Sequence, residues 1–113
     1  MEIEQLINNY KDFLVIVEGQ KDCQCLQHLG FTHILILNKP LFAVVEEVVA
    51  QQPQKVVLLT DLDTAGKKLY RYLYKHLTRH GIPVDDTLRH FLFKETPVRQ
   101  IEGLCSYLGL HKL

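Results

Sequence analysis

Two short apolar runs that stop abruptly at acidic residues constrain the fold of this sequence more than any other feature. Residues 15–17 lead into Glu18, and residues 56–59 lead, after one threonine, into Asp61 and Asp63. Runs this short and this rich in β-branched side chains are typical of buried parallel strands. Because the carboxyl ends of parallel strands meet at one edge of a sheet, we expect the three carboxylates to lie there together.

Three carboxylates at one edge repel one another. At ~5 Å and an effective dielectric constant of about 20, each ionised pair costs roughly 3 kcal/mol. A hard divalent cation removes this cost, so we expect Mg²⁺, or Mn²⁺ in its place, together with phosphate oxygens. Asp61 and Asp63 are two residues apart and point to the same side in extended backbone, as shared ligands must. The alternative is that one of them only caps the helix beginning near Thr64.

Strand and helix patterns alternate along the rest of the sequence. The predicted strands are residues 13–18, 33–37, 55–60 and 88–93. The predicted helices are residues 2–10, 20–29, 40–50, 64–80 and a final one capped by Thr96, with Pro97 at its first position. This alternation predicts an α/β fold of three layers, with a mainly parallel four-stranded sheet flanked by helices. For Glu18 to meet Asp61, the first and third strands must be neighbours.

The length of the sequence predicts one domain over residues 1–113, with a core at about 11–108 and a short N-terminal helix at 2–10. Hydrophobic residues make up 47% and charged residues 23%, which is ordinary for a globular protein. No apolar stretch approaches the ~20 residues that cross a bilayer, and the first residues are too polar for a signal peptide. We therefore expect a cytoplasmic protein without a membrane partner.

The cysteines are Cys23, Cys25 and Cys105, an odd number without the spacing of a disulfide scaffold or a zinc site. Such a set suits a reducing compartment. We therefore expect all three to be packed or partly exposed thiols.

Recognition of phosphate would need a local basic patch, because the 13 basic and 13 acidic residues balance. The helix after Asp63 carries Lys67, Arg71, Lys75 and Arg79 at four-residue spacing without an interleaved acid. This basic stripe is either a solvent-exposed helix face or a track for phosphates. The candidates for contact with phosphate or nucleic acid are Gly19, Lys21, Gly66, Lys67, Lys68, Arg71 and Lys75.

The two acidic motifs resemble those of the Toprim domain, which topoisomerases, bacterial primases, overcoming-lysogenisation nucleases, recombination mediators and the ribonuclease that matures 5S ribosomal RNA share. They stand here as VIVEGQKD at 15–22 and LLTDLDTAGKKL at 58–69. The resemblance covers about residues 11–108, and the layout is most similar to small stand-alone Toprim proteins. It implies a Rossmann-like Toprim fold in which Asp61 and Asp63 bind Mg²⁺ and Glu18 is a general acid/base, a metal ligand or both.

The resemblance implies a Mg²⁺-dependent protein that processes phosphodiester bonds of DNA, RNA or nucleotides, as a nuclease or a phosphotransfer enzyme. The domains that deliver substrate in larger relatives are missing from this sequence, so two alternatives stay open. One is a non-catalytic module that binds nucleic acid or protein, as a homodimer or in a larger complex. The other is a haloacid-dehalogenase-type phosphatase, suggested by residues 61–64, although its nucleophilic aspartate normally follows the first strand. Glu102 falls at an Ile/Val-Glu pair of related sequences, and its role stays open.

Overall fold

The computed structural model describes residues 3–109 and places four parallel strands and six helices within them. The strands are β1 (Leu14–Val17), β2 (Ile34–Ile36), β3 (Val56–Leu58) and β4 (Val84–Asp85). The helices are α1 (Ile3–Tyr10), α2 (Gln20–His28), α3 (Leu41–Gln51), α4 (Thr64–Arg79), α5 (Thr87–Glu95) and α6 (Gly103–Tyr107). The α/β fold and the parallel sheet predicted from the sequence are confirmed.

The strand order β2-β1-β3-β4 makes β1 and β3 neighbours, as the acidic motifs required. Ile16 pairs with Leu58, and the N–H of Leu59 donates to the carbonyl of Ile16 at 3.0 Å. The two strands therefore end at the same level. Their carboxyl ends deliver the segments that follow, which begin at Glu18 and at Leu59, to one edge of the sheet.

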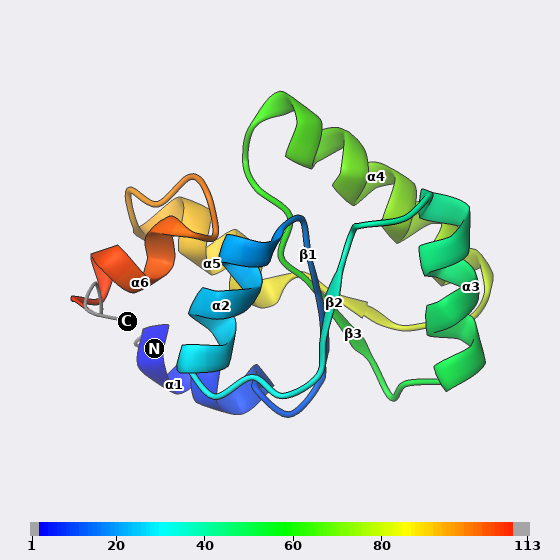
Figure 1. Cartoon of the computed structure of the whole chain (residues 1–113), viewed down its shortest axis with the longest axis horizontal. Helices are drawn as coiled ribbons and strands as arrows, with labels where there is room; N and C mark the ends of the chain where they lie inside the picture. The colour runs from blue at the N-terminus through cyan, green and yellow to red at the C-terminus, as the bar shows by residue number, and fades with distance from the viewer. Residues whose placement is uncertain (1–2, 110–113) are drawn as a thin grey trace.

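Helices cover both faces of the sheet because alternate strand residues point to opposite sides. Val15, Val17 and Val57 pack with buried residues of α1, α2, α5 and α6, whereas Ile16, Val56 and Leu58 pack with those of α3 and α4. Figure 1 shows the first group of helices to the left of the strands and the second group to the right. No helix within residues 3–109 is long and apolar enough to cross a membrane.

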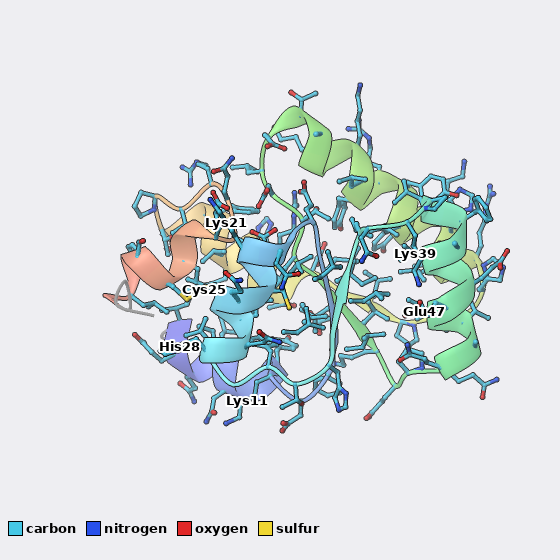
Figure 2. All side chains as sticks on the ribbon, viewed as in Figure 1. Lys11, Lys21, Cys25, His28, Lys39 and Glu47 are labelled. Carbon is cyan, nitrogen blue, oxygen red and sulfur yellow. A yellow bond between two sulfur atoms is a disulfide. The ribbon has the colours of Figure 1, made fainter. Side chains whose placement is uncertain are left out.

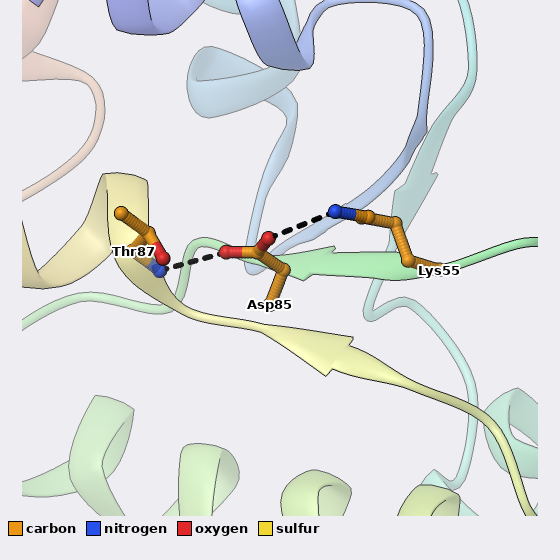
Figure 3. Close-up of polar contacts among 3 residues, drawn as sticks. All are labelled: Lys55, Asp85 and Thr87. Atoms are coloured by element: carbon orange, nitrogen blue, oxygen red, sulfur yellow. Dashed lines mark hydrogen bonds and ion pairs between the residues drawn. The ribbon is translucent and has the colours of Figure 1, made fainter.

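The predicted strand at 88–93 is wrong, because these residues form α5 and the fourth strand lies earlier, at Val84–Asp85. Leu88 and Leu92 are one helical turn apart and both are buried against the sheet. The carboxylate of Asp85 starts the helix: its Oδ1 accepts from the N–H of Thr87 at 2.9 Å, and its Oδ2 accepts from Lys55 Nζ at 3.2 Å (Figure 3). A short apolar run fits either element, and here helical packing prevails.

The final helix begins later than predicted, at Gly103 instead of Pro97. Thr96 does not cap it. The hydroxyl of Thr96 donates to the carbonyl of Leu92 at 2.6 Å and accepts from the N–H of Val98 at 3.2 Å, so it closes the end of α5 instead. Residues 96–102 form bends and a short turn between the two helices.

The expectation of three thiols is also wrong, because Cys25 and Cys105 form a disulfide. Cys25 lies on α2 (Figure 2), and Cys105 lies on α6, with the Cα atoms 5.8 Å apart. Cys23 remains a buried free thiol. The pairing joins residues 80 positions apart, which follows from the packing of the two helices and not from sequence spacing.

Candidate metal and nucleic-acid site

The three predicted carboxylates lie around the adjoining ends of β1 and β3. Glu18 follows β1, and its Oε2 accepts a hydrogen bond of 2.6 Å from the backbone N–H of Asp61. This contact joins residues 43 positions apart and fixes the glutamate against the loop after β3. The structure therefore brings Glu18 and the Asp61 loop together.

The two aspartate side chains are held by different backbone groups. Asp61 Oδ1 accepts from the N–H of Ile101 at 2.7 Å. Asp63 is the N-cap of α4, and its Oδ1 accepts from the N–H of Gly66 at 2.7 Å. As they stand, no group of three or more His, Cys, Asp or Glu side chains in residues 3–109 is arranged to hold a metal ion.

The donor set nevertheless suits a hard cation. Every candidate ligand is a carboxylate oxygen, and each of the three hydrogen bonds uses only one oxygen of its carboxylate, which leaves the second as a candidate ligand. The backbone N–H groups fix the orientation of each carboxylate, as outer partners of metal ligands do.

The site carries negative charge that its own hydrogen bonds do not neutralise. Burial raises the pKa of Asp61 from 3.8 to about 6; the Ile101 N–H opposes the rise, and the charge of Glu18 adds to it. Burial also raises the pKa of Glu18. The hydrogen bond from the Asp61 N–H opposes this rise, and the charge of Asp63 adds to it. A cation would relieve this repulsion.

Two glycines of the motifs have distinct structural roles. A Cβ on Gly66 would lie 2.1 Å from the carbonyl oxygen of Asp61, so only glycine lets α4 begin against this loop. Gly19 is the N-cap of α2, and its N–H donates to Asp22 Oδ2 at 3.0 Å. Asp22 is buried, and burial raises its pKa. It adds a fourth carboxylate beside the site, which the sequence motif contained but did not single out.

Sequence reasoning missed Arg89, a residue of α5 whose side chain binds the backbone of the loop after β3. Its Nε donates to the carbonyl of Thr60 at 2.8 Å, and its Nη2 donates to the carbonyl of Asp61 at 2.9 Å. The guanidinium lies over the rings of Tyr70 and Phe93, at 4.8 and 5.1 Å from their centroids. The wrong prediction of a strand at 88–93 hid this role, because it did not place residue 89 on a helix beside the buried Leu88 and Leu92.

The predicted phosphate contacts are two glycines, described above, and five cations. All five cations are exposed, and so is Arg79; they are Lys21, Lys67, Lys68, Arg71 and Lys75. Lys21 projects from the first turn of α2 (Figure 2). Ion pairs in residues 3–109 are Lys39–Glu47 and Lys55–Asp85, so none neutralises the basic stripe on α4. Of these cations, Lys67 lines a cavity together with Asp63. Glu102 is exposed and lies near Asp22.

Comparison with known proteins supports the motif assignment. The sequence matches the Toprim domain family over residues 13–93. It is 34% identical to a UPF0292 protein of Methanocaldococcus jannaschii, over 95% of this chain and 87% of that protein. It is 33% identical to a UPF0292 protein of Thermoplasma volcanium, over 80% of this chain and 77% of that protein. A solved structure from Aquifex aeolicus is 30% identical, with a TM-score of 0.77, and the match covers 88% of this chain and 92% of that one.

Proposed function

Because the chain belongs to the Toprim domain family, we propose that it is a Mg²⁺-dependent enzyme that processes phosphodiester bonds in nucleic acids or nucleotides. The family indicates a metal-dependent function related to nucleic acid. The observation that carries the finer proposal is the hydrogen bond from the Asp61 N–H to Glu18 Oε2, at 2.6 Å. It joins the Glu18 carboxylate of the first motif to the backbone of the second motif, where β1 and β3 end side by side.

Glu18, Asp61 and Asp63 would each hold the ion through the carboxylate oxygen that accepts no backbone hydrogen bond. When bound, Mg²⁺ would neutralise negative charge on the phosphoryl oxygens. Glu18 would move a proton at the attacking water or at the leaving oxygen. Arg89 keeps the backbone of Thr60 and Asp61 in place, and its positive charge lies near the carboxylates of Glu18 and Asp61.

The test is a cleavage assay on single- and double-stranded DNA and RNA and on nucleotides, with Mg²⁺ or EDTA. We expect Mg²⁺-dependent product from the wild type, and a fall in turnover of about 10² or more for Glu18→Gln, the usual contribution of general acid–base catalysis. Asp12→Asn is the control, because Asp12 is exposed and precedes β1 at the opposite edge of the sheet. Wild type that leaves every substrate intact contradicts the proposal.

Metal binding is tested separately, through the melting temperature. A ligand that binds the native state adds ~2.7 kcal/mol of stability at a hundredfold excess over Kd. Mg²⁺ should therefore raise the melting temperature of the wild type and not that of Asp61→Asn, which keeps an oxygen for the Ile101 N–H. An equal rise in both proteins would place the ion elsewhere.

A second candidate function is a non-catalytic module that binds nucleic acid or protein with the same surface. It is favoured by the present roles of the aspartates, since Asp61 and Asp63 each hold a backbone N–H and form no metal-binding group in residues 3–109. In that case the wild type shows no metal-dependent cleavage, and Asp61→Asn alters stability or partner affinity alone.

A further inference from the structure

A cavity of about 670 Å³ opens directly beside Asp63. One wall is formed by the loop after β3 and the first turn of α4, including Asp63 and Lys67. The opposite wall is the segment after α5, which contributes Arg99 and Tyr107 and lies outside residues 13–93, the part that matches the family. The cavity has the size of a small-ligand site.

The second wall is fastened to the first by main-chain and side-chain bonds. The N–H of Leu62 donates to the carbonyl of Arg99 at 3.0 Å, and the N–H of Ile101 donates to Asp61 Oδ1 at 2.7 Å. Arg99 Nη1 donates to the carbonyls of Thr96 and Val98, at 3.0 and 2.8 Å. The cavity is therefore preformed, which lowers the entropy cost of binding a ligand.

The lining combines two kinds of recognition. Lys67 and Arg99 supply positive charge on opposite walls, next to the Asp63 carboxylate. Tyr107 is 47% exposed, and Pro97 and Val98 provide an apolar surface nearby. An exposed aromatic ring beside a cationic pair suits a planar base joined to a phosphate, since bases stack on aromatic rings without regard to sequence. In a duplex the base faces are already stacked, so they cannot reach the ring.

We propose that this cavity binds one unpaired nucleotide, with its phosphate toward Lys67 and Arg99 and its base on Tyr107. The assignment rests on the proposed function, because the phosphate is directed toward Asp63 and its neighbouring carboxylates. Its consequence is selection of substrate: the protein takes a free nucleotide or an unpaired end of a nucleic acid in preference to a duplex.

Binding is measured by calorimetry with three probes: AMP, a short single-stranded DNA and the same DNA as a blunt duplex, each in Mg²⁺ and in EDTA. We expect the single strand to bind more tightly than the duplex. Tyr107→Ala should weaken single-strand binding about tenfold, whereas Tyr107→Phe should keep it. AMP that binds with the same dependence on Tyr107 identifies a free-nucleotide site, and AMP that does not bind identifies an unpaired end.

Two matched controls lie outside the cavity. Tyr74 on α4 is 45% exposed, nearly the same as Tyr107, and Lys94 on α5 is exposed like Lys67 but does not line the cavity. We expect Tyr74→Ala and Lys94→Gln to change single-strand affinity less than twofold, and Lys67→Gln to weaken it several-fold. Equal losses from the control and cavity variants would place binding outside the cavity and overturn the proposal.

The experiment separates this inference from the enzymatic one. Loss of binding in Tyr107→Ala, with a wild type that cleaves nothing, supports the cavity and contradicts the enzyme. Cleavage by the wild type with unchanged kcat/KM in Tyr107→Ala and Lys67→Gln supports the enzyme and overturns the cavity. Tighter binding of the duplex, or no binding of any probe, also overturns it.

Discussion

At the scale of single residues, Asp61 combines two opposing environments. It accepts a backbone hydrogen bond of 2.7 Å, which favours the charged carboxylate, yet burial and neighbouring acids raise its pKa to about 6. The raised pKa shows that the hydrogen bond does not compensate for the surroundings. The sequence could predict that Glu18 meets the loop of Asp61, because the end of each strand is a local signal. It could not predict the Ile101 contact, which depends on how the chain folds 40 positions later.

This environment predicts how stability depends on pH in EDTA. The folded-state pKa of Asp61, about 6, lies above its ordinary value of 3.8, so the folded protein binds more protons than the unfolded chain between these values. The contribution of Asp61 is therefore fully present below pH ~4 and is lost as pH rises through about 6. Denaturation by urea from pH 4 to 7 should show wild type losing stability relative to Asp61→Asn across that window. A relative gain would contradict the raised pKa.

At the scale of elements, α5 is the element whose type the sequence pattern predicted wrongly. Residues 88–93 contain bulky apolar side chains suited to a strand, but Leu88 and Leu92 are buried one helical turn apart. The helix assignment depends on Asp85, which accepts the N–H of Thr87, and on the short strand that precedes it. Both are tertiary features, because β4 forms only where β3 offers its edge. Missing the helix also meant missing Arg89.

The contacts of Arg89 predict that α5 holds the loop after β3, and with it the site, in position. Replacing it with Gln removes two hydrogen bonds to the carbonyls of Thr60 and Asp61 and should lower the free energy of unfolding by about 1.5–3 kcal/mol. Arg89→Lys keeps the charge without the fork of donors, so it should restore only part of this stability. If the site is catalytic, kcat should fall more than KM rises, because Arg89 touches the loop and not the substrate.

Arg79→Gln is the control for this measurement. Arg79 is an exposed arginine at the end of α4 and should change stability by less than about 0.5 kcal/mol. Equal unfolding curves for Arg89→Gln and wild type would show that the two contacts to the loop contribute nothing.

At the scale of the whole molecule, the C-terminal segment belongs to the core. Val98, Ile101 and Leu104 are buried with the sheet, and the disulfide joins Cys105 to α2. The pairing was beyond sequence reasoning, because three cysteines allow several pairings and only the packing of α2 against α6 selects one.

The disulfide predicts sensitivity to reductant. A cross-link over 80 positions restricts the unfolded chain, and its loss should lower the free energy of unfolding by about 2–4 kcal/mol. Wild-type protein should therefore melt at a lower temperature in dithiothreitol. The variant with Cys25→Ala and Cys105→Ala should melt low with or without reductant. A wild type that melts at the same temperature in both buffers would mean that the bond does not stabilise the fold.

The same bond also gives the chain a covalent topology. It closes residues 25–105 into a ring, and β1, with Glu18 at its end, lies on the tail outside the ring, inserted between β2 and β3 that belong to it. A single cut inside the ring, for instance at a protease site built into the exposed turn at Gly81, breaks no connection between tail and ring. The cut protein should run as one band on a non-reducing gel and as two bands after reduction, with Glu18 and Asp61 on the same fragment.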